Sequence, residues 1–169
     1  MPASSFPDRT DFLAKVFDAL PAPALVVDPD VRMIDFNLEA ARLIERVPFA
    51  ILDPPAGQAL ACIHAAESPA GCGHAEACPD CPIRNSVREA FATGQVCRRI
   101  ARIELARGGR NAAVDLLVSV APIAGEAEPL ALLVLDDAAE LAKLFAGGKS
   151  APAAGRRQRK PRRAAAGGF

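Results

Sequence analysis

Apolar and polar residues alternate along the chain in patterns that predict a series of helices and strands. Apolar side chains recur at helical spacing over 11–20 and predict a helix there. Two short apolar runs, 24–28 and 31–36, flank a Pro-Asp turn and predict a β-hairpin. Asn37 comes next and is a typical N-cap residue, so we expect a second helix to begin directly after it.

The second half of the chain predicts one long helix, three strands and a last helix. Pro82 is expected at the first helical position and Gly94 just past the end of that helix. The strands are predicted over 95–106, 111–123 and 129–137, and the last is nearly all apolar, which indicates a central strand. Within the first of these strands the residues expected to point inward are Val96, Ile100, Ile103 and Leu105. The last helix is predicted over 138–145.

Length and composition bound the class of protein. A chain of 169 residues that is 51% apolar predicts one globular domain with flanking extensions. The N-terminus lacks a signal-peptide pattern, and no apolar run reaches the ~18 residues that span a bilayer. We therefore expect a cytoplasmic protein without a membrane segment. Five cysteines in a reducing compartment indicate metal or redox chemistry rather than a disulfide framework.

The net charge of zero conceals an asymmetry along the chain. Residues 147–169 carry seven basic residues and no acidic one, whereas residues 1–146 carry 13 basic and 20 acidic residues. The basic segment is rich in Gly, Ala and Pro and has no apolar periodicity, so we expect a disordered tail. The predicted organisation is a leader over 1–10, a body over 11–146 and this tail.

Four cysteines within twenty residues are the strongest chemical signal in the sequence. Cys62, Cys72, Cys78 and Cys81 have the spacing C-x9-C-x5-C-x2-C, in a loop predicted over about 53–81. Four thiolates satisfy either a tetrahedral zinc ion or an iron–sulfur cluster. The last cysteine precedes the helix that begins at Pro82, where the helix dipole favours negative charge.

Three interpretations of this loop remain open from the residues. The four thiolates bind a 4Fe–4S cluster, or they bind structural zinc, or the CPDC sequence is a metal-free dithiol that closes to a disulfide. Zinc sites more often contain two CxxC pairs, and only one is present here, which modestly favours the cluster. His64 and His74 lie in the same loop and are candidate secondary ligands. Cys97 is expected to be a buried, metal-free cysteine on a strand.

The order of elements and two of the segments resemble the PAS domain family. The order is helix, two strands, helix, loop, helix, three strands, helix. The segments are LPAPALVVDPDVRMIDFNLEAARLI and LALLVLDD, and the resemblance extends from about Asp11 to Asp137. The GCG…CxxC segment resembles a subgroup of bacterial signalling PAS domains with a four-cysteine insertion. The resemblance implies an α+β fold with a five-stranded antiparallel sheet, helices packed over one face and a cysteine-rich metal-binding loop.

Other PAS cofactors find no matching residues. The long helix has no histidine for a haem iron, and no Asn-Cys-Arg motif is present for a photoreactive flavin, so neither is expected. A small organic ligand between sheet and helices stays open. The sequence also lacks a P-loop, a dinucleotide fingerprint and a nucleophile elbow, so we expect no enzymatic activity.

The basic tail suggests a second kind of partner. Arg156, Arg157, Arg159, Lys160, Arg162 and Arg163 are candidates for weak, salt-sensitive binding of nucleic acid or another polyanion. No aromatic residue is interleaved with them, so base stacking is not supported.

Two functions follow from these observations. The first is a cytoplasmic sensory PAS protein in signal transduction whose metal centre, with iron–sulfur favoured, responds to redox state or oxygen. It would signal through a partner protein or a homodimer, for example in regulation of transcription. The second is a zinc-stabilised interaction or nucleic-acid-binding regulatory protein that uses the basic tail.

Overall fold

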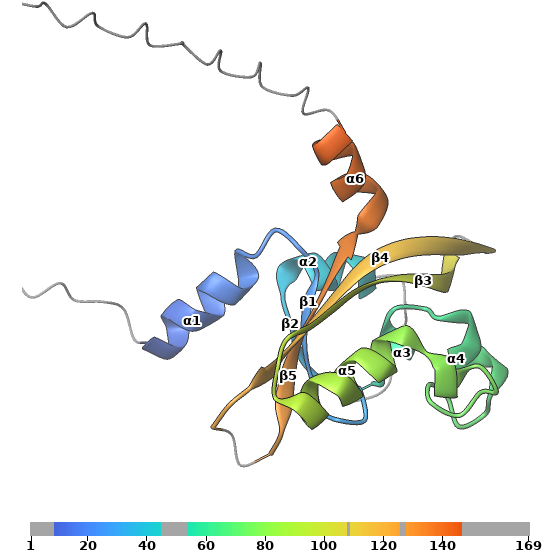
Figure 1. Ribbon diagram of the computed structural model, residues 1–169, viewed down its shortest axis with the longest axis horizontal. Coiled ribbons are helices and arrows are strands. Elements are labelled where there is room, and N and C mark those ends of the chain that lie inside the picture. The colour runs from blue at the N-terminus through green and yellow to red at the C-terminus, as the bar shows by residue number, and fades with distance from the viewer. Residues whose placement is uncertain (1–8, 45–53, 108, 126–127, 147–169) are drawn as a thin grey trace, which may run out of the picture.

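The computed structural model of the protein describes residues 9–44, 54–107, 109–125 and 128–146. Its centre is a five-stranded antiparallel sheet with the strand order β2-β1-β5-β4-β3 (Figure 1). The strands are β1 (Ala24–Val27), β2 (Met33–Phe36), β3 (Cys97–Arg107), β4 (Arg110–Ile123) and β5 (Leu130–Asp137). The α+β class and the five-stranded sheet predicted from the sequence are therefore confirmed.

The helices are distributed unequally around the sheet. They are α1 (Arg9–Asp18), α2 (Leu38–Ile44), α3 (Ala56–Ala59), α4 (Ile63–Glu67), α5 (Pro82–Thr93) and α6 (Ala138–Ala146), with a 3-10 turn over Cys78–Asp80. The long helix α5 packs across β3, β4 and β5, whereas α1 and α6 project away from the body (Figure 1). No helix in the described residues is long and apolar enough to cross a membrane.

Strand β5 lies at the centre of the sheet, as its apolar sequence predicts. It pairs with β1 on one side and with β4 on the other. Ala131, Leu133 and Leu135 alternate along it and are buried on the face that α5 covers, because successive side chains of a strand point to opposite faces. This row forms the middle of the hydrophobic core.

The inward face of β3 differs from the prediction at two positions. Val96 and Ile100 are 61% and 72% exposed, so their predicted inward orientation is wrong, whereas Ile103 and Leu105 are buried as expected. The pairing of β3 with β4 runs without a bulge from Cys97 to Arg107, so the inward positions are all odd-numbered. The sequence pattern assigned residues of both strand faces to the inward set, because each face carries an isoleucine, Ile100 on one and Ile103 on the other.

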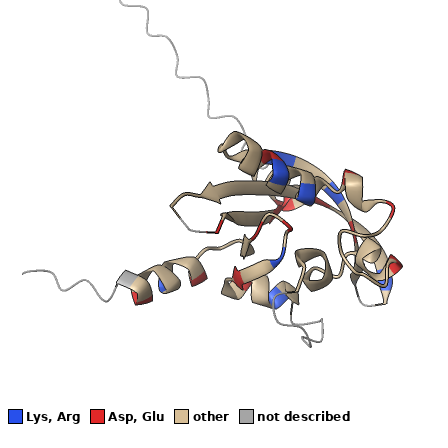
Figure 2. Ribbon diagram, turned by 90° about the horizontal axis from the view of Figure 1, so that it is seen from below, with Lys and Arg blue, Asp and Glu red and all other residues tan. Residues whose placement is uncertain are grey.

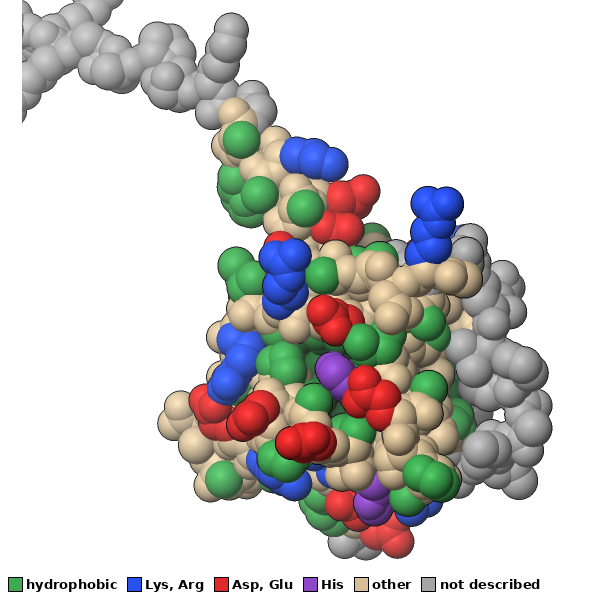
Figure 3. Space-filling view, turned by 90° about the vertical axis from the view of Figure 1, so that its right-hand side faces the viewer, with side chains coloured by type: hydrophobic (Ala, Val, Ile, Leu, Met, Phe, Trp, Pro, Cys, Tyr) green, Lys and Arg blue, Asp and Glu red, His purple; other side chains and the backbone are tan. Residues whose placement is uncertain are grey.

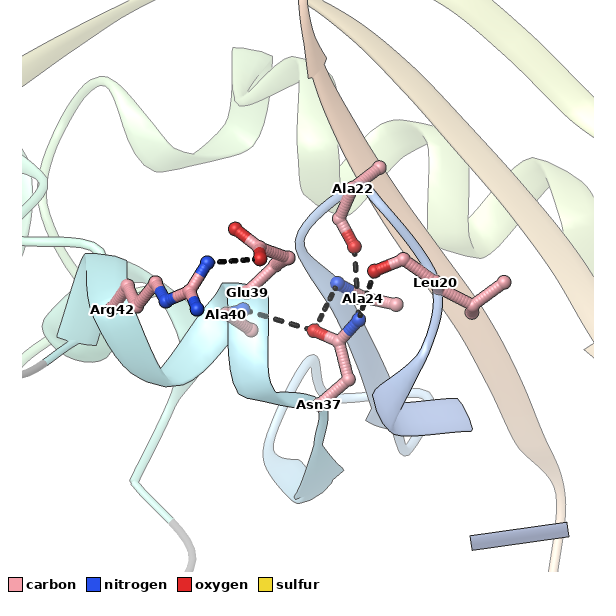
Figure 4. Close-up of polar contacts among 7 residues, drawn as sticks. All are labelled: Leu20, Ala22, Ala24, Asn37, Glu39, Ala40 and Arg42. Atoms are coloured by element: carbon pink, nitrogen blue, oxygen red, sulfur yellow. Dashed lines mark hydrogen bonds and ion pairs between the residues drawn. The ribbon is translucent and has the colours of Figure 1, made fainter. Parts of the chain in front are cut away.

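Asn37 joins the hairpin to α2 and is 1% exposed. Its side-chain oxygen accepts hydrogen bonds from the backbone N–H groups of Ala40 (2.9 Å) and Ala24 (3.0 Å) (Figure 4). Its side-chain nitrogen donates to the carbonyl oxygens of Ala22 (2.9 Å) and, at 3.4 Å, of Leu20. The predicted N-cap is confirmed, and the same side chain also fixes the entry into β1.

The cysteine segment is more ordered than the loop predicted from its composition. It contains α3, α4 and the 3-10 turn, and it contributes Ala56, Ala59 and Leu60 to the hydrophobic core. Small alanine side chains allow this close packing against the sheet. Residues 1–8 of the predicted leader over 1–10 and the tail over 147–169 lie outside the described residues. The helix α1 begins at Arg9, inside the predicted leader.

Charged side chains of both signs occur on the described elements (Figure 2). Helix α1, for example, carries Asp11, Lys15 and Asp18. Lys15 and Asp11 form an exposed ion pair at 2.6 Å, a type of contact that contributes little to stability. The six basic residues proposed to bind polyanions belong to the tail beyond the described part of the chain.

Candidate cysteine site

The four cysteines of the predicted site line one cavity of about 360 Å³. The cavity lies between the cysteine segment, the N-terminal end of α5 and the end of β3, and its walls are mostly apolar. They include Val31, Leu60, Ile83, Ile103 and Leu105. The fold thus gathers thiols that are up to nineteen positions apart in sequence around a single space next to the core.

Cys78 and Cys81 occupy the turn that leads into α5. Cys78 lies in the 3-10 turn and is 6% exposed, and Cys81 is the N-cap residue of α5. The N–H of Cys81 donates to the carbonyl oxygen of Cys78 at 3.2 Å. Pro82 is at the first helical position and Gly94 ends the helix in the left-handed conformation, so both predicted boundaries are confirmed.

Gly57 in α3 lies against both of the other two cysteines. A Cβ atom at Gly57 would be 2.5 Å from the Cys72 sulfur and 3.7 Å from the Cys62 Cβ. The carbonyl oxygen of Gly57 also accepts a hydrogen bond from the N–H of Cys62 at 2.8 Å. Only a residue without a side chain leaves room for Cys72 here, a constraint that the sequence analysis missed.

Gly71 and Gly73 flank Cys72 and have φ angles of 79° and 96°. These left-handed conformations are readily available only to glycine, and they turn the chain sharply on both sides of the thiol.

Burial raises the pKa of the Cys62 thiol, and the nearby thiols of Cys81 and Cys72 raise it further. Backbone hydrogen bonds from His64 and Ala65 oppose this shift, because they stabilise the thiolate. The net effect of these contributions is a raised pKa of Cys62. A metal bound at this thiol would have to release the proton.

The two histidines differ in their relation to the cavity. His64 lines it, and its Nδ1 is 2.8 Å from a carboxylate oxygen of Glu67. His74 is exposed and does not line this cavity. The face in Figure 3 has histidine side chains at the surface with acidic and hydrophobic side chains around them.

The donor chemistry of this cavity fits a metal centre, because thiolates are the preferred ligands of zinc and of iron–sulfur clusters. Gly57 provides space for one of the four sulfurs, and all four side chains border the same cavity. In the described residues, however, no group of three or more His, Cys, Asp or Glu side chains is placed so as to hold a metal ion. Metal binding would therefore require the four side chains to move closer together.

Ala61 connects the cysteine segment to the sheet in a strained conformation. Its φ is 57°, a value that is unfavourable for a residue with a Cβ atom. Its carbonyl oxygen accepts a hydrogen bond from the N–H of Ala106 at 2.8 Å, and Cys62 forms an isolated antiparallel bridge with Leu105. Strain of this kind is often found at functional sites.

A second cavity of about 430 Å³ lies on the other side of this connection. Leu60 and Leu105 line both cavities, and the second is also lined by Glu140, Leu141 and Leu144 of α6. The cysteine cavity and α6 are thus separated by a thin apolar wall that no sequence pattern indicated.

Replacing Ala61 by glycine is expected to raise the free energy of unfolding by about 0.5–1 kcal/mol. Relief of the left-handed strain gains about 1–2 kcal/mol, and the flexibility of glycine in the unfolded chain offsets part of it. Urea unfolding measures the change. The control, Ala113→Gly on the exposed side of β4, should instead lower stability by about 0.5–1 kcal/mol. If Ala61→Gly lowers the free energy of unfolding as much as the control does, Ala61 is not strained in the folded protein.

Cys97 is buried at the start of β3 and does not line the cysteine cavity. The guanidinium of Arg99 lies 3.3 Å from its sulfur and also pairs with Glu89 of α5. Cys97 is therefore separate from the four-cysteine site, as expected.

Solved structures similar to this chain include PAS domains. The PAS domain of a Colwellia psychrerythraea protein is 19% identical, with a TM-score of 0.52 over 77% of this chain and 97% of that one. The PAS domain of nitrogen regulation protein NR(II) from Vibrio parahaemolyticus is 15% identical, with a TM-score of 0.50 over 74% and 96%. An RNA-binding light-oxygen-voltage receptor is 18% identical, with a TM-score of 0.51 over 87% of this chain and 41% of that one.

No protein-family model matches the chain, and no curated protein matches it. The structural likeness nevertheless defines the class: this chain has the fold of a PAS domain. The resemblance noted from the sequence is confirmed to that extent.

Proposed function

We propose that this protein is a cytoplasmic sensory domain of the four-cysteine PAS subgroup in signal transduction. Its Cys62, Cys72, Cys78 and Cys81 bind a metal centre, and an iron–sulfur cluster is favoured over zinc. The observation that carries the proposal is that all four thiols border one cavity against the core of a PAS fold. When bound, such a centre supplies chemistry that responds to redox state or oxygen.

The contacts of the site suggest how its state would reach a partner. Cys62 is linked to the end of β3 through the bridge to Leu105, and the neighbouring hydrogen bond joins Ala61 to Ala106. Leu105 also lines the cavity beneath α6. A movement of Cys62 toward a ligand would therefore shift Leu105, which lines the same cavity as Glu140, Leu141 and Leu144 of α6. We infer that a homodimer or a partner protein reads the position of α6.

The apolar surface of α6 is consistent with such a readout. Leu144 and Phe145 are among the most exposed large apolar side chains in the described residues. Side chains of this type on a terminal helix favour contact with another protein surface. The proposal assigns the domain no enzymatic activity, haem or photoreactive flavin.

The proposal is tested by metal analysis of the protein purified without oxygen. We expect iron and sulfide in equal amounts, with about four of each per chain and a broad absorbance near ~400 nm that bleaches in air. If the protein is colourless and holds one zinc ion per chain, the metal centre is structural zinc and not an iron–sulfur cluster. Protein with neither metal would contradict the proposed metal centre.

Replacing Cys72 by alanine should lower the bound metal per chain about tenfold or more, because it removes a ligand rather than a supporting contact. The matched control is Cys97→Ala, since Cys97 is a cysteine outside the cavity and should leave metal content unchanged. Equal loss in both variants would indicate unfolding instead of lost ligation. Circular dichroism of each variant distinguishes these outcomes.

A zinc-stabilised protein that binds nucleic acid is the second candidate function. It is supported by the seven basic residues over 147–169, six of which lie in the sequence RRQRKPRR. It is also supported by the likeness to a receptor described as RNA-binding, although that likeness concerns the fold. Retardation of RNA that weakens steeply with salt and vanishes on deletion of 149–169 would favour it.

A further inference from the structure

We propose that Cys62 and Cys72 are a thiol pair that closes to a disulfide by exchange with a small-molecule disulfide, and that Gly57 is the positioning residue of this pair. The reaction belongs to the metal-free protein and does not depend on the proposed metal centre. It differs from the pairing that the sequence suggests, in which the CxxC cysteines, Cys78 and Cys81, react with each other.

The proposal rests on the convergence of the two side chains at Gly57. The Cβ atoms of Cys72 and Cys62 lie 3.1 Å and 3.7 Å from the point where a Cβ of Gly57 would be. The Cys72 sulfur is 2.5 Å from the same point. A disulfide needs the two Cβ atoms about 3.5–4.5 Å apart. Both Cβ atoms lie within 4 Å of one point at Gly57, which makes these two side chains neighbours.

A backbone hydrogen bond holds Cys62 near this space, and two glycine turns hold Cys72 there. The N–H of Cys62 donates to the carbonyl oxygen of Gly57, so Cys62 is fixed to the same residue that makes room for Cys72. Gly71 and Gly73 turn the chain on each side of Cys72 and direct the thiol toward α3. Cys62 and Cys72 are thus both placed by their contacts with Gly57 of α3.

Accessibility separates this pair from the CxxC pair. Exchange requires that a thiolate reach a sulfur of the incoming disulfide. Cys62 and Cys72 are both half-buried, whereas Cys78 is buried within the 3-10 turn. Cys81 is also half-buried, and it raises the pKa of Cys62 more than Cys72 does, so Cys81 is the main competitor of Cys72 for Cys62.

The chemistry balances without another reagent. One thiolate of the pair attacks a sulfur of a disulfide RSSR, which forms a mixed disulfide and releases the first RSH. The second thiolate attacks the protein sulfur of the mixed disulfide and releases the second RSH. The two cysteines lose two electrons and two protons, and RSSR gains both to become two RSH molecules.

Closure of this disulfide would change the candidate metal site. It converts two of the four thiol donors to a form that cannot ligate as thiolates. It also joins the segment around Cys72 covalently to Cys62, which is bridged to Leu105 of β3. The pair would therefore control metal loading and fix the cysteine segment against the sheet.

The first experiment maps disulfides in the native chain. Metal-free, full-length protein is incubated with oxidised glutathione, the remaining thiols are alkylated, and peptides are analysed without reduction by mass spectrometry. We expect the Cys62–Cys72 linkage to be the most abundant. A predominance of Cys78–Cys81, of Cys62–Cys81 or of stable glutathione adducts would overturn the proposal.

Two glycine variants test the positioning role. Gly57→Ala should lower the yield of Cys62–Cys72 about tenfold, because the added methyl group overlaps the Cys72 sulfur. Gly94→Ala is the matched control, since a Cβ there meets no atom within 4 Å, although its left-handed conformation makes it strained as well. An unchanged yield in folded Gly57→Ala would contradict the role of Gly57.

A third variant tests the Cys62–Cys72 pair without a substitution at Gly57, which could itself disturb folding. Cys78→Ala removes the CxxC pair and should leave the Cys62–Cys72 yield within about twofold of the native value. Loss of the linkage in this variant, with native circular dichroism, would show that the pair depends on Cys78 and would overturn the assignment. Zinc content measured on the same samples shows separately whether the metal-binding proposal holds.

Discussion

Replacing Asn37 by alanine is expected to lower the free energy of unfolding by about 3 kcal/mol. The substitution leaves the buried N–H of Ala24 and the N–H of Ala40 without their shared acceptor, and it removes the donor to Ala22. A buried polar group left without a partner costs about 1–3 kcal/mol, and loss of an N-cap costs about 1 kcal/mol. Urea unfolding followed by circular dichroism measures the change.

Asn111→Ala is the control for this measurement. Asn111 is exposed on β4, so its replacement should change stability by no more than about 0.5 kcal/mol. A loss in Asn37→Ala as small as in the control would mean that the four hydrogen bonds of Asn37 do not hold the hairpin and α2 together.

Replacing Leu105 by alanine should lower the free energy of unfolding by about 3 kcal/mol as well. Leu105 is 2% exposed, and removal of a buried leucine side chain costs about 2–5 kcal/mol through lost burial and the cavity that remains. The effect has a second part, because Leu105 lines both the cysteine cavity and the cavity beneath α6. Leu105→Ala would therefore connect the cysteine cavity with the cavity beneath α6.

Leu144→Ala provides the matched control on α6. Leu144 also lines the cavity beneath α6, but it is 75% exposed, so the same change should cost less than about 1 kcal/mol. Hydrogen exchange of α6 on zinc addition, measured in both variants, tests the transmission. An undiminished response of α6 in Leu105→Ala would exclude the Leu105 wall as the route.

Local patterns account for most of the secondary structure. Asn37, Pro82 and Gly94 mark element boundaries through their own side-chain or backbone chemistry, and the structure places each where its residue type predicts. The apolar sequence of 130–137 likewise indicates a central strand, and the structure places it between β1 and β4. These features depend on neighbours in sequence and are therefore visible without a fold.

The face of β3 shows where such patterns fail. Its sequence places isoleucine at positions 100 and 103, on opposite faces of the strand, and apolar character alone does not tell which is buried. Register against β4 decides, because a shift of one residue would reverse every side chain. Pairing across the sheet is a long-range property.

The candidate site divides in the same way between sequence and tertiary structure. The spacing of the four cysteines by itself indicated a metal site, because four thiols within twenty residues are typical of zinc and iron–sulfur ligand sets. Only the tertiary structure decided that Gly57 seats Cys72 beside Cys62, that Ala61 is held in a left-handed conformation, and that Leu105 separates the cysteines from α6. Each of these contacts joins segments distant in the chain, and close packing in three dimensions sets them rather than any local preference.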